Sequence, residues 1–536
     1  MRARLAAALL AALLTVPLLG VTSASAAPRD LTGPELPGPT AVTAGDRATA
    51  ALDRAQRLLT EKSSAAARRQ AEKGADATLA LRNLVRAYDD LSASDREAAD
   101  RLLARPTDGG ADPDGNGYTT TEATPRCGDV VCIHYVPTTS DAPNMTDTSP
   151  ANGVPDSVEQ ALALAEGVNS TYTAAGYRRP DPDGSLGGSS GKVDIYLANL
   201  GDQGLYGYCT TDQGGDTYNR WAYCVIDDDF AEFPANTPLE NLQVTLAHEY
   251  FHAVQFAYDT FEDGWVMEAT ATWAEEQLFD SVDDNRQYIQ AGQVGRPYYP
   301  LDYYGDSAHY GNWVFFQYLT ERWRGETGGM PTLVLDLWKR LSGRAGDPDD
   351  FSTQALQNVL AARGTSFTKT YGQFAEAMRQ PAKALAEGKA AAYRPAAPAD
   401  SATLSPRVRV AAGEIPVNHL TNLALRIKPS RKLGSADWRL KVQVDMPPKA
   451  TAPVSRVVTH LKSGKTASTT LKFRKRGWST TAGAFSARKV KYVELVIANA
   501  SRRSNCWVSI DSPFACLGQP LDDGKVFGIR TTAFRR

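Results

Sequence analysis

The sequence lacks a long apolar run outside its first residues. There, Leu5 to Val21 form an apolar stretch rich in Leu and Ala, which follows Arg2 and Arg4 and ends at Ala24-Ser25-Ala26. These features are typical of a secretory signal peptide, so we expect residues 1–26 to be removed and the protein to be secreted, hence extracellular. No later segment has the roughly 18 apolar residues that a bilayer-spanning helix needs. We therefore expect no membrane attachment after cleavage.

Cysteine is scarce, and no two cysteines have the Cys-x-x-Cys spacing of common structural zinc sites. The chain has six cysteines, and an even number in an exported protein indicates disulfide bonds. We favour pairing between sequence neighbours, because each such pair closes a short loop. The expected disulfides are Cys127–Cys132, Cys209–Cys224 and Cys506–Cys516.

Net charge is also low, at −3, but it is distributed unevenly. Residues 405–536 hold 25 Lys and Arg against 7 Asp and Glu, a net of +18, so the remainder carries −21. The basic region could bind an anionic cell-wall or polysaccharide surface, dock on the acidic part, or be a solvated face. Its aromatic residues are too scattered for base stacking, so we expect no nucleic-acid partner.

Internal repeats are absent, and the length of 536 residues predicts two or three folded units, since single cores stop growing at about 250–300 residues. Helical periodicity between Arg47 and Leu103 predicts two or three helices, so residues 27–105 are either a prosegment or a helical cap. Short strands then alternate with a helix in residues 130–226, which indicates a mixed α/β layer.

The predicted fold class is an α+β zincin-like catalytic domain, with a mixed sheet and active-site helices, followed by an all-β sandwich. We place the catalytic domain at residues 106–386. An Ala/Pro-rich linker at 387–406 follows it, and the basic β-sandwich domain covers 407–536.

One motif carries the chemistry. Thr237-Pro238-Leu239-Glu240 is a strong helix start, and the helix contains His248-Glu249-Tyr250-Phe251-His252. Side chains at i and i+4 share one helix face, so both imidazoles can bind one Zn²⁺ at about 2.0–2.1 Å. Glu249 between them can act as general base towards the zinc-activated water. The pattern predicts a metal site that lacks one ligand.

The missing ligand should be a carboxylate on the next helix, which we expect from Trp265 to Phe279. Glu268 lies early in it and is followed by small residues that allow close packing. Glu275, two turns later on the same face, is the alternative ligand or a group that hydrogen-bonds a ligand. Thr272, between the two, is a second candidate for that supporting role.

At this point the sequence resembles a known group of enzymes. His-Glu-x-x-His followed by Trp-x-x-Glu-x-x-Ala-x-Trp looks like the gluzincin clan of metallopeptidases, whose third zinc ligand is a glutamate on a second helix. More narrowly, the segments 248–255 and 265–270 are similar to a family of exported bacterial metalloproteases, and the similarity covers about residues 127–320. The resemblance implies peptide-bond hydrolysis of protein or peptide substrates.

Two related signatures are missing. The metzincin extension is absent, because Gln255 and Tyr258 stand where glycine and a third histidine would be needed. The Gly-x-Met-Glu-Asn signature of related aminopeptidases is absent too, so an endopeptidase is the better interpretation. A donor for the transition-state oxyanion is still required, and His309 and Tyr310 are the candidates, with a purely structural role as the alternative.

A weaker signal lies at Asp112-Pro113-Asp114-Gly115-Asn116, where oxygen ligands alternate around a glycine as in a Ca²⁺ loop. The twelfth position is Ala123, so the loop is not a complete EF-hand. Asp112, Asp114 and Asn116 therefore either bind calcium or form an Asp/Gly turn. The rival to the peptidase reading is a secreted binding protein on a zincin scaffold without turnover.

Overall fold

In the computed structural model, the described residues are 43–61, 75–106, 117–188, 191–508 and 512–536. The predicted signal peptide lies outside these ranges, and so do the candidate calcium residues Asp112, Asp114 and Asn116. Among the described residues, none of the helices combines the length and the apolar character needed to cross a bilayer.

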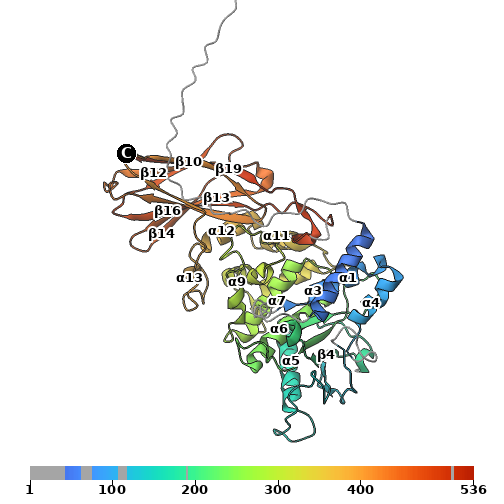
Figure 1. The fold of residues 1–536 in the computed structure, drawn as a ribbon. Coiled ribbons are helices and arrows are strands. Elements are labelled where there is room, and N and C mark those ends of the chain that lie inside the picture. The colour runs from blue at the N-terminus through green and yellow to red at the C-terminus, as the bar shows by residue number, and fades with distance from the viewer. Residues whose placement is uncertain (1–42, 62–74, 107–116, 189–190, 509–511) are drawn as a thin grey trace, which may run out of the picture. The chain divides into compact units, whose positions relative to one another are not determined.

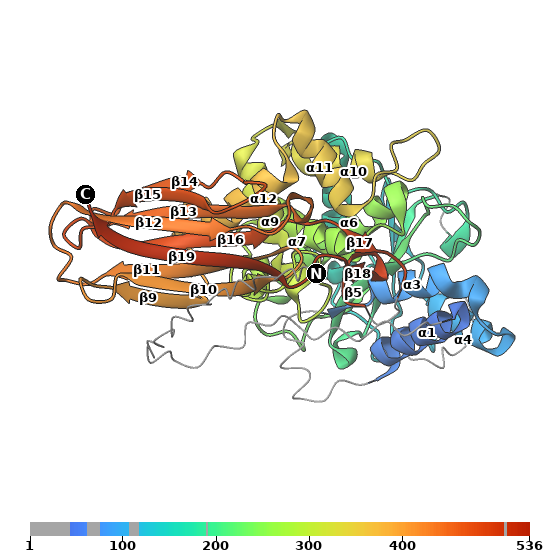
Figure 2. The same cartoon turned by 90° about the horizontal axis from the view of Figure 1, so that it is seen from above.

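Helices come first in the described chain, as the periodicity predicts. Thr43 begins the first one with a capping box to Asp46, and Ser92 caps the third by accepting a hydrogen bond from Asp95 N. Such caps satisfy backbone N–H groups that a helix start leaves unpaired. The blue helices of this region lie together in both views (Figures 1 and 2). The elements are α1 Ala44–Thr60, β1 Ala75–Asp76, α3 Thr78–Ala87 and α4 Ala93–Leu103.

A six-stranded mixed sheet follows, with the order β1-β5-β6-β4-β3-β2. The central strands β3, β4 and β6 are parallel, whereas β5 runs antiparallel to β6 and β1 runs parallel to β5. The mixed α/β layer predicted for residues 130–226 is therefore confirmed. Strand bounds are β2 Arg126–Cys127, β3 Val131–His134, β4 Val193–Ala198, β5 Leu205–Thr210 and β6 Tyr223–Asp227.

Both faces of this sheet are covered, which explains why strands β3 to β6 are buried along their whole length. In β4, Ile195 belongs to one hydrophobic core and Tyr196 to another, because successive side chains point to opposite faces. Helices α5 and α6 contribute to the first core, and α1, α3 and α4 to the second. The N-terminal helices thus cover one face of the sheet.

A buried arginine fixes the end of the N-terminal helical region. The guanidinium of Arg105 forms ion pairs with Asp183 and Asp212, each at 2.7 Å, and with Asp194. The side chain of Arg105 is fully buried. Close by, the hydroxyl of Tyr223 donates a hydrogen bond to Leu103 O at 2.9 Å. Residues 103–105 are therefore fixed to the sheet region by the ion pairs of Arg105 and by the hydrogen bond from Tyr223 to the backbone of Leu103.

The helices that follow the sheet position the predicted motif. Thr237 and Glu240 form the expected capping box at the start of α6, with Pro238 in its first turn. A short turn then leads into α7. The bounds of these and the later helices are α5 Asp156–Ala174, α6 Pro238–Asp259, α7 Gly264–Phe279, α8 Ala308–Gly311, α9 Trp313–Arg322, α10 Thr332–Leu341, α11 Ser352–Ala362, α12 Phe367–Ala377 and α13 Pro381–Ala384, with the short hairpin β7 Glu326–Thr327 and β8 Met330–Pro331.

The C-terminal region is mostly antiparallel β structure. Figure 1 shows this region in orange to red. One sheet has the order β10-β19-β12-β15 and the other β14-β13-β16-β11-β9. In β12, Trp438, Leu440, Val442 and Val444 are buried alternately and join the core of this region. The bounds are β9 Asp400–Leu404, β10 Val410–Val417, β11 Thr421–Pro429, β12 Trp438–Asp445, β13 Pro453–Leu461, β14 Thr466–Thr470, β15 Ser479–Ala484, β16 Val490–Asn499, β17 Ser504–Asn505, β18 Gln519–Pro520 and β19 Lys525–Arg535.

The predicted order of fold classes is confirmed: a mixed α/β region with helices precedes a mostly-β region. The local disulfide pairing is also confirmed, with Cys127–Cys132, Cys209–Cys224 and Cys506–Cys516 all formed. Three disulfides are characteristic of an oxidising compartment. The predicted domain boundaries at residues 105, 386 and 406 stay predictions.

Candidate metal centre

Helix α6 brings His248 and His252 together on one buried face. Their ring centroids lie 4.8 Å apart, and their exposed fractions are 7% and 0%. Glu268, in the second turn of α7, is also fully buried. The ligand atoms of these three residues all lie within 4.8 Å of one another. The structure therefore groups the predicted ligands from two separate helices into one site that could hold a metal ion.

The distances fit a tetrahedral ion. Glu268 Oε2 lies 3.3 Å from His248 Nε2 and 3.7 Å from His252 Nε2. Ligand atoms bound to zinc at about 2.0–2.2 Å with tetrahedral angles are separated by roughly 3.3–3.6 Å. The second oxygen, Glu268 Oε1, is buried and has no hydrogen-bond partner among the described residues. A buried carboxylate oxygen in this state is costly unless a cation neutralises it.

Charges within the site are strongly coupled. Burial alone would raise the pKa of Glu268, but His252 and His248 hold it well below its usual range. Burial alone would also lower the pKa of His248, whereas hydrogen bonds to Glu268 and Glu275 raise it well above its ordinary value. Since metal ligands must be deprotonated, a cation that binds here displaces protons. We expect metal affinity to fall as the pH falls.

Two further side chains orient the histidines by contacting their Nδ1 atoms, on the other side of each ring from Nε2. Glu275 Oε1 lies 2.7 Å from His248 Nδ1, so Glu275 supports a ligand and is not itself one of the grouped ligands. Gln255 Oε1 lies 2.8 Å from His252 Nδ1, and Gln255 Nε2 donates to Met267 O. Gln255 was not predicted in this role, although its i+3 spacing from His252 places it on the same face of α6.

Replacing Gln255 with Ala should weaken zinc binding by about 10- to 100-fold, because the ring of His252 loses the acceptor that fixes its orientation. Competition with a chromophoric chelator measures the affinity. Gln243→Ala, at a half-buried position of the same helix five residues before His248, is the matched control and should bind zinc as the wild type does. Equal affinities for the two variants would show that Gln255 does not orient His252.

Glu249 lies next to the grouped ligands on α6 and is 2% exposed. Its Oε2 accepts a hydrogen bond of 3.3 Å from Thr78 Oγ1. A Cβ atom on Gly207 would lie 3.0 Å from Glu249 Cγ, so the side chain of Glu249 packs directly against β5. The absence of a side chain at position 207 therefore gives the carboxylate its place between α6 and the sheet.

The two candidate oxyanion donors lie on α8, near the site. The ring centroid of Tyr310 is 6.0 Å from that of His248, and His309 packs on Tyr310 at 4.2 Å and on Tyr304 at 4.4 Å. Burial lowers the pKa of His309 to about 4, so its imidazole is neutral near pH 7. Because His309 Nδ1 accepts from Gly305 N at 3.2 Å, the proton of the neutral ring lies on Nε2.

Thr272 completes the set of predicted residues. It is fully buried on α7, between Glu268 and Glu275, and its hydroxyl has no hydrogen-bond partner among the described residues. Its supporting role stays a prediction.

No known protein family and no curated protein matches this chain. The candidate centre therefore rests on its own residues and geometry. These comprise three ligands within reach of one ion, two supporting side chains, and an adjacent buried glutamate.

Proposed function

We propose that the protein is a secreted zinc-dependent endopeptidase that cleaves protein or peptide substrates. One observation carries the proposal: the His248, His252 and Glu268 ligand atoms have the spacing of a tetrahedral zinc ion, and Glu249 lies beside them. Zinc suits a site of two imidazoles and one carboxylate, and such sites with three protein ligands are typical of catalytic centres. The three disulfides support the secreted location.

In this proposal zinc, when bound, supplies the Lewis acidity that polarises the scissile carbonyl and acidifies water. The carboxylate of Glu249 takes a proton from the attacking water while the oxygen of that water bonds to the carbonyl carbon. Glu249 then passes that proton to the leaving nitrogen as the C–N bond breaks. The Nε2–H of His309 or the hydroxyl of Tyr310 donates to the oxygen that gains negative charge.

Removal and restoration of the metal test the proposal. The purified chain should contain one zinc ion, lose hydrolysis of casein after dialysis against 1,10-phenanthroline, and regain it with one equivalent of Zn²⁺. Glu268→Ala should not regain it at that zinc concentration, because one of three protein ligands is missing. Zinc without hydrolysis would favour a silent binding scaffold, and a chain without stoichiometric metal would refute the metal centre itself.

A further inference from the structure

The outer edge of β5 is occupied by the chain's own N-terminal region. Residues 75 and 76 form β1, whose backbone pairs in parallel with Leu205 and Gly207 of β5. Two residues later, Thr78 Oγ1 accepts a hydrogen bond of 2.9 Å from Cys209 N. The other edge of β5 pairs with β6 from Gly207 to Thr210, so β5 has partners on both sides from Gly207 to Cys209.

This part of β5 borders the proposed general base. Gly207 packs against Glu249, and Thr78 donates its hydroxyl proton to Glu249 Oε2 at 3.3 Å. One hydroxyl therefore bridges the edge strand and the carboxylate. In this arrangement one oxygen of the proposed general base, Glu249 Oε2, accepts a hydrogen bond from Thr78.

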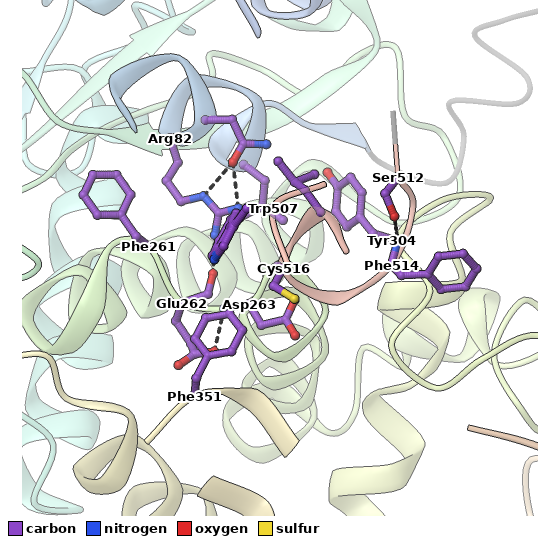
Figure 3. Close-up of a pocket in the computed structure, with 14 residues that line it drawn as sticks. Arg82, Phe261, Glu262, Asp263, Tyr304, Phe351, Trp507, Ser512, Phe514 and Cys516 are labelled. Atoms are coloured by element: carbon purple, nitrogen blue, oxygen red, sulfur yellow. Dashed lines mark hydrogen bonds between the residues drawn. The ribbon is translucent and has the colours of Figure 1, made fainter. Parts of the chain in front are cut away.

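A second set of contacts anchors helix α3, which begins at Thr78. Arg82 of α3 donates to the backbone oxygen of Glu262, in the turn between α6 and α7 (Figure 3). Arg82 Nη1 also lies 3.3 Å from Met267 Sδ. A Cβ on Gly264 would lie only 2.8 Å from Leu79 Cδ1, so α3 also packs closely on the start of α7. The start of α3 thus contacts both α6 and α7, the helices that carry the candidate metal ligands.

We propose that residues 75–82 form a built-in block of the candidate site, which must move aside before an extended peptide can enter. The inference rests on the proposed function. An extended peptide that adds to an exposed sheet edge gains main-chain hydrogen bonds, and here β1 and Thr78 already make those bonds. Peptide and block compete for one edge, so the apparent affinity for peptide is reduced by the fraction of molecules that are open.

The anchoring of Arg105 limits how the block opens. Arg105 is fully buried among three aspartates, and α1, α3 and α4 share a core with the sheet. Release of the whole region would expose that core and leave the aspartates without a counter-charge. Opening is therefore a local displacement of residues 75–82, and the block is reversible because the rest of the N-terminal region stays in place.

The test uses the zinc-loaded full chain and a peptide hydroxamate long enough to pair with β5, with its dissociation constant measured by calorimetry. Thr78→Val removes the hydroxyl without changing the side-chain shape. Two lost hydrogen bonds shift the equilibrium towards the open state, so affinity should rise about five- to tenfold. Thr60→Val, the same change at the exposed end of α1, should have no effect. Acetohydroxamate is too short to pair with β5, so its affinity for Thr78→Val should exceed its affinity for the wild type by less than twofold.

Amide hydrogen exchange of residues 205–209 is the second measurement, and it should be faster in Thr78→Val than in the wild type. Faster exchange without tighter peptide binding would overturn the block, and so would weaker binding, which would make Thr78 a positioning residue for Glu249. Thr78→Ala replaces the valine variant if the latter unfolds, and Thr78→Ser should behave as the wild type. If no variant hydrolyses peptides but the affinity pattern holds, the peptidase proposal fails and the block stands.

Discussion

Glu249→Gln should retain one zinc ion per chain and lose about 10²- to 10⁴-fold in kcat on a quenched fluorescent peptide. The amide has nearly the shape of the carboxylate, so packing against Gly207 and the hydrogen bond from Thr78 can persist. It cannot accept the proton of the attacking water. Since the defect lies in the transition state, KM should change little.

Glu240→Gln is the matched control for this experiment. It makes the same change on the same helix, and glutamine at that position can still complete the capping box with Thr237. Its kcat should equal that of the wild type. If Glu249→Gln turned over peptide as fast as Glu240→Gln, the assignment of Glu249 as general base would be wrong, whatever the zinc content.

Arg105→Met should cost about 3–5 kcal/mol in the free energy of unfolding, because it leaves buried carboxylates without their cation. Burial alone would lower the pKa of Arg105, yet Asp212 and its other acidic neighbours raise it above its ordinary value. Urea titration at pH 8 measures the loss. Arg57→Met, at an exposed position of α1, should lie within about 0.5 kcal/mol of the wild type.

The deficit of Arg105→Met should shrink as the pH is lowered from 8 towards 5. Burial already raises the pKa of Asp183 to about 6 with Arg105 present, and loss of the guanidinium raises it further. A carboxyl whose pKa is higher in the folded state than in the unfolded state binds more protons when folded, so acid stabilises the fold relative to neutral pH. A deficit that does not change with pH would contradict the electrostatic explanation.

The two candidate histidine ligands could be predicted because the signal for them lies within one helix. His248 and His252 stand four residues apart in a helix whose start is marked by Thr237 and Pro238, and helix geometry then places both rings on one face. Glu268 followed from the next predicted helix, in which small residues follow it and allow close packing. The positions of strands β3, β4 and β6 could be predicted for the same reason, because each strand is a short and mostly apolar segment of the sequence.

What could not be predicted depends on contacts between distant residues. Thr78 and Glu249 are 171 positions apart, and no periodicity links a threonine at a helix start to a carboxylate on another helix. Strand β1 has two residues, too few for an alternating pattern. Gln255 does lie at a local spacing, but its role becomes visible only when Met267 O and His252 Nδ1 are found on either side of it.

The sheet with two covered faces also bears on how the chain folds. Helices α1, α3 and α4 emerge first during synthesis, yet they pack on Tyr196, Tyr208 and Tyr223, and the hydrogen bond from Tyr223 to Leu103 spans 120 positions. Closing contacts over such long stretches is slow. The apolar faces of α1, α3 and α4 therefore have no complete sheet to pack on until β6 has been synthesised. We expect the chain to be most prone to aggregation during this interval.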